Sequence, residues 1–166
     1  MVATALAAAV LAGCGVVVGR GSLSEPPEEV GSGEVAMQIF SDPTGSTLLL
    51  VPVSFGDAGP FQFILDTGAS RTVIDPELAG ELRLTTGATA RGRGMVAEFQ
   101  GELVDVESWR VGDIALQPRT IVAAQLPEAP QGPAFRGLLG SDVLAGFGAV
   151  RIDYDRKILT LDGAAE

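Results

Sequence analysis

Histidine is absent from this 166-residue chain, and cysteine and lysine each occur once, as Cys14 and Lys157. Without an imidazole, neither a Ser-His-Asp triad nor a Cys-His pair can form, and most catalytic zinc sites lack their usual ligand. A single cysteine excludes an intrachain disulfide and a cysteine-rich metal site. We therefore expect no metal and no cofactor.

Basic residues are also few. Eleven lysines and arginines stand against 21 acidic residues, which gives a formal net charge of -10. A surface this acidic repels phosphate backbones, so nucleic acid is excluded as a partner. Aromatic residues make up only 5% of the chain, but 46% of it is hydrophobic and 19% is charged. This composition is typical of a folded globular domain and not of a disordered chain.

The first residues have the pattern of a targeting segment. No charged residue occurs in 2–19, and Leu11-Ala12-Gly13-Cys14 resembles the lipobox of bacterial lipoproteins, in which the cysteine is lipidated. The chain departs from that pattern because residues 1–4 include no lysine or arginine. We expect a signal peptide over 1–14 and a protein held to a membrane through Cys14, outside the cytoplasm, in a periplasmic or extracellular location. An uncleaved anchor and ordinary secretion are the alternatives.

A linker and one domain are expected to follow. The stretch 19–33 mixes Gly, Ser, Pro and Glu with almost no apolar periodicity, which is typical of a flexible tether. We therefore assign 15–33 to a flexible acidic linker and 34–166 to a single folded domain.

Short strands are predicted through most of this domain. The apolar run 48–55 and the segment 60–65 flank the turn signal Gly56-Asp57-Ala58-Gly59, a pattern typical of a hairpin. Alternate residues Phe61, Phe63 and Leu65 share one face of the second strand. Further strands are expected at 35–40, 73–74, 114–116 and 120–124, with a closing hairpin of 150–154 and 158–161. Many short strands at close spacing predict an all-β barrel or sandwich.

One or two short helices are expected as well. Asp75 is predicted to be the N-cap of a helix over 76–82 that begins with Pro76. A second helix over 141–147 is predicted to be capped by Ser141 or Asp142. Between them, Gly101 is predicted to be the turn of a hairpin with strands at 95–100 and 102–111.

One segment has a pattern typical of catalysis: the apolar strand Phe63-Ile64-Leu65 ends in Asp66-Thr67-Gly68-Ala69-Ser70. Hydrolysis without a metal or a nucleophile needs one group that takes a proton from water and another that gives a proton to the bond being broken. Two carboxyls about 3 Å apart do both, because like charges that close share one proton. Asp66 is the candidate carboxyl, and Gly68 lets backbone approach it closely. The alternative is a buried, hydrogen-bonded Asp66 in a strand turn.

The sequence Leu138-Leu139-Gly140 occurs about 70 residues after this segment. The combination resembles the retropepsin-like aspartic peptidases, the single-lobe relatives of pepsin, over 48–161. The resemblance implies a closed all-β barrel of the acid-protease type, with Asp66, Thr67 and Gly68 as catalytic residues. It further implies that Ala69 and Ser70 contact substrate or brace the turn, and that Leu138, Leu139 and Gly140 support the active-site loop from below.

Only one Asp-Thr-Gly occurs in the chain, whereas pepsin-like chains have two. The resemblance therefore implies a homodimer in which each copy supplies one aspartate and which binds an extended polypeptide. Within one chain, Asp142 is the rival second carboxyl, unless it is a helix cap. A flap is expected in the glycine-rich stretch 87–94 and the hairpin 95–104, unless that stretch is an ordinary surface loop. A non-catalytic peptide-binding or assembly module of the same fold is the alternative function.

Overall fold

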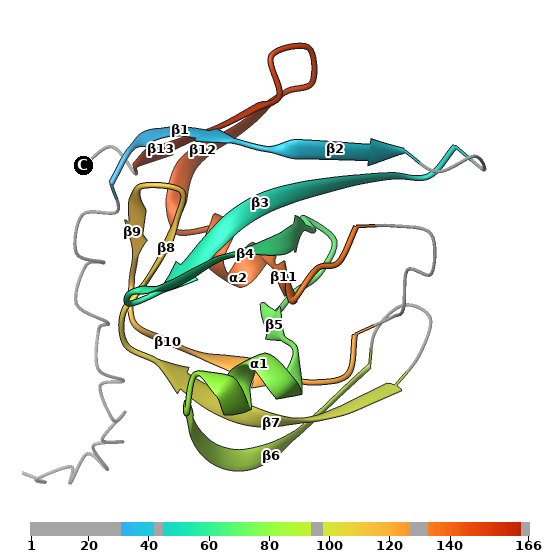
Figure 1. Cartoon of the computed structure of the whole chain (residues 1–166), viewed down its shortest axis with the longest axis vertical. Helices are drawn as coiled ribbons and strands as arrows, with labels where there is room; N and C mark the ends of the chain where they lie inside the picture. Colours follow the sequence, from blue (N-terminus) through green and yellow to red (C-terminus); the bar gives the residue numbers. More distant parts are fainter. Residues whose placement is uncertain (1–30, 42–44, 94–97, 127–132, 164–166) are drawn as a thin grey trace, which may run out of the picture.

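The computed structural model describes residues 31–41, 45–93, 98–126 and 133–163. The predicted signal peptide, its Cys14 and residues 15–30 of the predicted linker lie outside these ranges. The described residues form two β-sheets and two short helices (Figure 1). None of the described helices is both long enough and apolar enough to cross a membrane.

The larger sheet has ten strands in the order β6-β7-β10-β5-β11-β4-β3-β8-β9, and β2 also pairs with β3. Its strands are β2 (Gln38–Ser41), β3 (Thr47–Phe55), β4 (Ala58–Leu65), β5 (Val73–Ile74), β6 (Thr85–Arg93), β7 (Glu98–Val106), β8 (Trp109–Val111), β9 (Ile114–Leu116), β10 (Arg119–Ala123) and β11 (Gly137–Leu139). The smaller sheet has the order β1-β13-β12, with β1 (Gly33–Ala36), β12 (Phe147–Asp153) and β13 (Ile158–Gly163). The predicted all-β fold is confirmed, but among the described residues neither sheet closes on itself.

Two predicted hairpins are confirmed. β3 and β4 pair antiparallel with Val53 opposite Phe61, and β12 pairs with β13 across a turn at 154–157. On β4, Phe63 and Leu65 are buried while Gln62 and Ile64 on the other face are only half-buried. Alternation predicts these strands because one buried face requires every second residue to be apolar.

Gly101 is not a turn residue, and the predicted hairpin around it is wrong. Gly101 lies inside β7, which pairs on one side with β6 and on the other with β10. A Cβ at Gly101 would lie 2.5 Å from the carbonyl oxygen of Ala123. This position therefore requires glycine because β10 passes close to it, and not because the chain reverses there. The glycine-rich stretch beginning at Gly87 is likewise strand β6 up to Arg93, and its connection to β7 at 94–97 lies outside the described residues.

Two further boundaries differ from the prediction. The single strand expected at 35–40 is two strands, because β1 pairs with β13 of the smaller sheet whereas β2 pairs with β3 of the larger one. The second helix, α2 (Ser141–Leu144), ends before Phe147, which is the first residue of β12.

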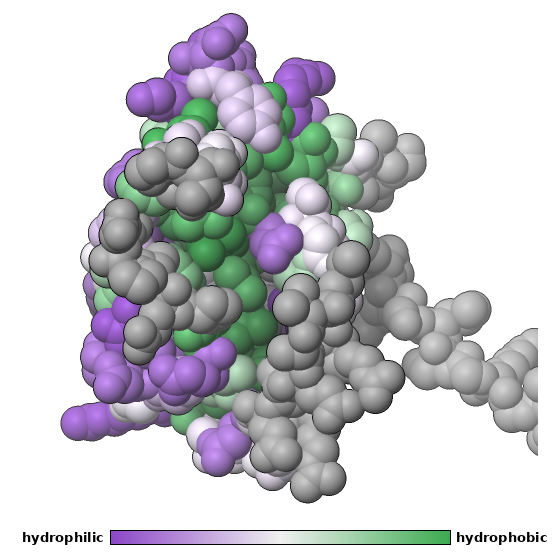
Figure 2. All heavy atoms as spheres, turned by 90° about the vertical axis from the view of Figure 1, so that its right-hand side faces the viewer, coloured by the Kyte–Doolittle hydropathy of each residue, from purple (hydrophilic) through white to green (hydrophobic). Residues whose placement is uncertain are grey.

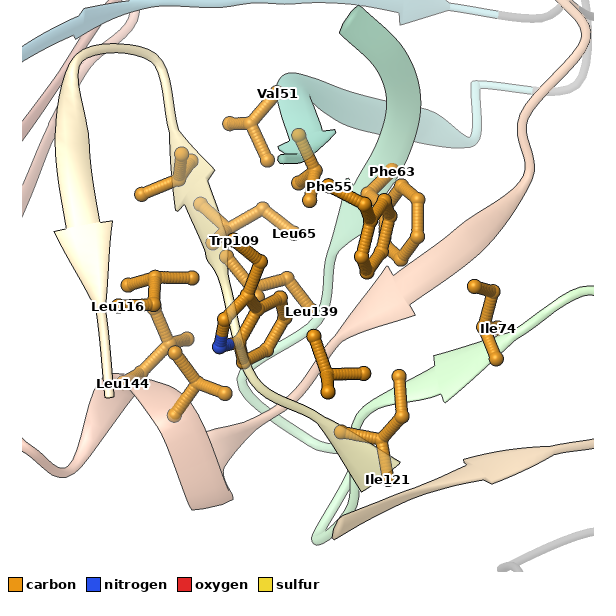
Figure 3. Close-up of a cluster of buried hydrophobic side chains, with 14 of the residues drawn as sticks. Val51, Phe55, Phe63, Leu65, Ile74, Trp109, Leu116, Ile121, Leu139 and Leu144 are labelled. Carbon is orange, nitrogen blue, oxygen red and sulfur yellow. The ribbon is translucent and has the colours of Figure 1, made fainter. Parts of the chain in front are cut away.

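A single hydrophobic core lies beneath both sheets and both helices (Figure 3). The rings of Phe55 and Trp109 stack with centroids 6.0 Å apart, and Phe63 lies 5.8 Å from Phe55. The indole Nε1 of Trp109 donates to the carbonyl of Gln117 at 2.9 Å, which satisfies its one polar group. Leu139, which precedes the predicted supporting glycine, is fully buried in this core.

Helix α1 (Pro76–Glu81) begins as predicted. The carboxylate of Asp75 accepts a hydrogen bond from the Leu78 amide at 3.1 Å, and Pro76 occupies the first turn. Arg136, directly before β11, donates to Glu81 at 3.1 Å and to Asp75 at 3.3 Å. These two carboxylates, Glu81 foremost, raise the pKa of the Arg136 guanidinium above its ordinary value. The contacts hold α1 against the segment that enters β11.

Candidate active site

Asp66 is the first residue after β4, and the backbone holds one of its carboxylate oxygens. Its Oδ1 accepts hydrogen bonds from the amides of Gly68 at 2.9 Å and Ala69 at 3.2 Å. No donor among the described residues reaches its Oδ2. The Asp66 side chain is half-buried, while Thr67, Gly68 and Ser70 are exposed. The turn therefore fixes the orientation of the carboxylate and leaves one oxygen open to water or to another molecule.

Strand β11 supports the Asp66 loop through main-chain hydrogen bonds. It lies between β4 and β5, parallel to the first and antiparallel to the second, with Leu138 opposite both Ile64 and Val73. The carbonyl of Leu139 accepts the amide of Asp66 at 3.0 Å. The support expected from Leu138 and Leu139 is thus present in the structure as main-chain pairing on the strand that ends at Asp66.

Gly140 and Ser141 contact the same loop after Asp66, at Ala69 and Arg71. The amide and the hydroxyl of Ser141 both donate to the carbonyl of Ala69, each at 2.8 Å. A Cβ at Gly140 would lie 2.6 Å from the backbone carbon of Arg71 and 3.0 Å from the Ala69 oxygen. Only glycine allows α2 to approach the loop this closely. The Ser141 hydroxyl is used in this contact and does not cap the helix.

The prediction of Asp142 as a helix cap is wrong. The N-cap of α2 is Gly140, without a side-chain hydrogen bond, and Asp142 lies in the first turn. Its Oδ1 accepts the hydroxyl of Thr72 at 2.7 Å, and its Oδ2 lies 3.9 Å from the guanidinium of Arg119. Arg119 also donates to the main-chain carbonyl of Asp142. The Val143 amide also donates to Oδ1, at 3.0 Å, whereas Oδ2 accepts no hydrogen bond among the described residues. The Asp142 side chain is only 9% exposed, so its carboxylate faces the interior of the structure.

Thr72 and Arg119 were missed by sequence reasoning. Thr72 is fully buried, donates to Asp142 and accepts the amide of Gly140 at 3.0 Å through the same hydroxyl oxygen. Its carbonyl accepts the amide of Val122. The sequence carries one signal: Thr72 directly precedes the apolar pair Val73-Ile74. A threonine at the start of a buried strand is itself buried, and buried threonine is uncommon. No sequence pattern connects it to partners about 70 residues away.

Replacing Thr72 with valine is expected to lower the free energy of unfolding by about 2 kcal/mol. The change keeps the shape of the side chain but leaves the Gly140 amide and the Asp142 carboxylate without their shared partner in a buried place. Thr72→Ser keeps the hydroxyl and is the matched control. Urea unfolding of both variants measures the difference, and equal losses would contradict a role for the hydroxyl.

Apolar residues line the other face of the strands that carry the site. Ile64, Leu138 and Val73 lie in one row across β4, β11 and β5, all half-buried and outside the central core. The row continues on β10 with Val122, which pairs with Val73 and is 3% exposed. The side of the molecule that lies to the right in Figure 1 is apolar and hollowed along its middle (Figure 2). Such a surface next to a carboxylate suits an apolar segment of a ligand.

Among the described residues, no three His, Cys, Asp or Glu side chains gather in a group that would hold a metal ion. Asp66 is the candidate reacting group, as an oriented carboxylate on a loop that β11 and α2 hold. One carboxylate can accept a proton from water, but a reaction that also requires a proton donor needs a second group.

Comparison with known proteins agrees with this geometry. A protein-family model described as aspartyl protease matches residues 51–143, which include both the Asp66 loop and Gly140. Fourteen chains of solved structures match, among them a retropepsin-like aspartic protease from Rickettsia conorii. That crystal structure is 22% identical, with a TM-score of 0.52, over 82% of this chain and 95% of the other.

The solved structure shows that the fold is the retropepsin-like one. No match was found among curated protein sequences. The family model covers more than half of the chain, and the turn that orients Asp66, the strand beneath it and the close contact at Gly140 all lie inside the matched region. On these grounds the chain belongs to the aspartyl protease family.

Proposed function

We propose that this protein is an aspartic endopeptidase whose active site is completed by a second copy of the same chain. The observation that carries the proposal is the Asp66 carboxylate, with Oδ1 held by two backbone amides and Oδ2 left open. The chain supplies only one Asp-Thr-Gly, and Asp142 is engaged by Thr72 and Arg119. A second Asp66 from a partner is therefore the candidate for the missing group.

The chemistry follows from two carboxyls that share one proton. The ionised carboxyl takes a proton from a water molecule, whose oxygen attacks the carbonyl carbon of the peptide. The protonated carboxyl gives its proton to the carbonyl oxygen, so a tetrahedral diol forms. Collapse of the diol breaks the carbon–nitrogen bond: the carboxyl that took the proton from water passes it to the leaving nitrogen, and the other carboxylate takes a proton from a hydroxyl of the diol, which becomes the product's carbonyl oxygen. One ionised and one protonated carboxyl are thereby regenerated.

Other residues are assigned roles by position. Thr67 is exposed beside Asp66, where its hydroxyl is free to contact the partner loop and keep the two carboxyls coplanar. Ala69 and Ser70 follow in the same loop, next to the path of an extended substrate. The β6–β7 hairpin is the candidate flap, which closes over the substrate and excludes water. The substrate binds as an added strand, mainly through main-chain hydrogen bonds.

We also propose that the protein acts outside the cytoplasm, held to a membrane by a lipid on Cys14. The support is the lipobox-like Leu11-Ala12-Gly13-Cys14 and the uncharged run around it. Metabolic labelling with a radioactive fatty acid in a bacterial host is expected to label the chain but not its Cys14→Ser variant. Equal labelling of the two chains would contradict the anchor.

The proposed function is tested by the dependence of hydrolysis on protein concentration. Below the dimer dissociation constant, doubling the concentration of the full chain is expected to raise the rate about fourfold, because dimer concentration follows the square of monomer concentration. An unfolded protein mixture at mildly acidic pH serves as substrate, and light scattering measures the mass. A folded dimer that hydrolyses nothing at any concentration would instead favour the peptide-binding module.

The pH dependence of hydrolysis provides an independent check. A pair that works with one ionised and one protonated carboxyl loses activity when both are protonated and when both are ionised. The rate is therefore expected to follow a bell-shaped curve against pH. A rate that stays flat between about pH 3 and 7, the range in which carboxyl pairs titrate, would contradict this mechanism.

A further inference from the structure

Arg119 connects strand β10 to helix α2. Its guanidinium donates through Nη1 to the main-chain carbonyl of Asp142, and the same nitrogen lies 3.9 Å from the Asp142 carboxylate. β10 lies in the larger sheet between β7 and β5, whereas α2 follows Gly140, the residue that packs against the Asp66 loop. A side chain of the sheet therefore reaches the helix that supports the candidate active site.

The carboxylate of Asp142 depends on a nearby positive charge. Its side chain is 9% exposed. Oδ1 accepts hydrogen bonds from Thr72 and Val143, but Oδ2 accepts none from the described residues. A buried carboxylate costs free energy unless a cation lies beside it. Within the described part of the chain, Arg119 is the one cation less than 4 Å from this carboxylate.

We propose that Arg119 is a positioning residue for Asp66: its charge keeps the Asp142 carboxylate in the interior, and Asp142 in turn keeps α2 against the Asp66 loop. Asp142 Oδ1 accepts the hydroxyl of Thr72 at 2.7 Å, and the same hydroxyl oxygen accepts the amide of Gly140 at 3.0 Å. This inference rests on the proposed function, because Asp66 is the group that the contacts orient. It adds a residue that touches neither substrate nor the reacting carboxylate.

Further hydrogen bonds continue from α2 to Asp66. The amide and the hydroxyl of Ser141, the residue after Gly140, donate to the carbonyl of Ala69, each at 2.8 Å. The amide of Ala69 donates to Asp66 Oδ1 at 3.2 Å. A shift of α2 therefore moves Ala69 and the amide that orients the Asp66 carboxylate, because packed segments have little room to move independently. Small displacements of a catalytic group slow the reaction.

A small cavity lies beside Arg119. Its volume is about 50 Å³, and its lining includes the buried side chains of Trp109, Val143 and Phe147. Among the described residues that line it, Arg119 alone is charged. Nothing else in the lining can therefore replace the guanidinium as the positive charge next to Asp142. A shorter side chain at 119 would enlarge the cavity and leave room for a free guanidinium ion, which has four non-hydrogen atoms.

The main test removes the positive charge with and without its carboxylate partner, in the full chain. Arg119→Met is expected to lower kcat about tenfold and to change KM by about twofold or less, because Asp66 is displaced while the contacts with substrate remain. Adding Asp142→Asn to that chain is expected to restore kcat to within about threefold, because a neutral amide needs no counter-charge and still accepts the Thr72 hydroxyl. A double variant as slow as Arg119→Met would overturn the proposal.

Free guanidinium provides a second readout. At low concentrations that leave the chain folded, guanidinium chloride is expected to raise the rate of Arg119→Ala about threefold, because the ion enters the enlarged cavity and pairs with Asp142. Sodium chloride at the same concentration is expected to have no such effect, and equal responses to the two salts would contradict the proposal. Arg110→Ala is the matched control: Arg110 is exposed on β8 and donates to the carbonyl of Gly56 at 3.1 Å. Its rate is expected to equal that of the unmodified chain with either salt.

Hydrogen exchange of backbone amides tests the same contacts without hydrolysis. The Gly140 amide, which donates to the buried Thr72 hydroxyl, is expected to exchange about tenfold faster in Arg119→Met and to recover when Asp142→Asn is added. The Gly112 amide, which donates to the carbonyl of Pro52 at 2.9 Å, serves as the reference and is expected to stay unchanged.

The outcomes separate this inference from the proposed function. Faster exchange at Gly140 and Gly112 alike would make Arg119 a residue of general stability and overturn the positioning role. If the unmodified chain hydrolyses peptides, an unchanged rate in Arg119→Met overturns the role as well. If no chain hydrolyses peptides, faster exchange at Gly140 that Asp142→Asn reverses would support the contacts and contradict the proposed function.

Discussion

Replacing Asp66 with asparagine is expected to lower the rate of peptide hydrolysis by at least about 10³-fold while the protein stays folded. The amide cannot take a proton from water, and a dimer of the variant has no ionisable group at either position. Its side-chain oxygen still accepts the amides of Gly68 and Ala69, so the loop keeps its shape. Single-turnover hydrolysis and thermal unfolding measure the two effects separately.

A matched substitution shows whether the loss belongs to this site. Asp57 is an exposed aspartate in the β3–β4 turn, and Asp57→Asn is expected to leave the rate unchanged. An excess of the Asp66→Asn chain added to the unmodified chain is expected to inhibit it, because mixed dimers contain only one carboxyl. Undiminished hydrolysis by the Asp66→Asn chain alone would disprove the assignment of Asp66 as catalytic.

Replacing Gly140 with alanine is expected to have the second largest effect: about 2–3 kcal/mol less stability and about 10²-fold slower hydrolysis. The new Cβ would lie 2.6 Å from the backbone of Arg71, and main chain has little room to move in a packed place. The Asp66 loop must shift to accept it, and small displacements of a catalytic group are costly to the rate. Gly140 has φ of −94°, so the effect arises from space alone.

Gly80 provides the matched glycine-to-alanine control. It lies in α1 with no atom within 4 Å of the position its Cβ would take. Gly80→Ala is expected to raise stability by up to about 1 kcal/mol, because alanine favours the helix over the unfolded chain. Urea unfolding gives both values, and rates are compared at a temperature where all variants are folded. Similar effects of the two substitutions would contradict the close contact at Gly140.

Several features of the fold could be predicted because neighbouring residues carry the signal. The β3–β4 hairpin follows from an apolar run and an alternating strand on the two sides of a turn that contains Gly56 and Gly59. The start of α1 follows from Asp75 and Pro76, whose side chains act on the backbone within one turn. Gly101 was misread for a corresponding reason: glycine marks turns and close approaches alike, and only the passage of β10 beside β7 distinguishes them.

The support of the site was predicted in part. The packing of Leu138-Leu139-Gly140 beneath the loop followed from a resemblance. The roles of Thr72 and Arg119 did not, because they depend on pairs far apart in the chain. Asp142 shows the limit clearly: next to a helix start, an aspartate predicts the N-cap, yet Gly140 is the N-cap and the carboxylate of Asp142 accepts the buried hydroxyl of Thr72 as well as the Val143 amide.

The sequence by itself determined the chemistry that the proposed function can use: with no imidazole, one cysteine, and one Asp-Thr-Gly after an apolar strand, a carboxylate is the candidate reacting group. Tertiary structure alone decided that β11 enters between β4 and β5, that Asp142 turns to Thr72, and that β12 keeps a free edge. The physical reason is the separation along the chain of the residues that interact. Alternation, caps and turns depend on residues a few positions apart, whereas these contacts form only when distant segments pack on a common core.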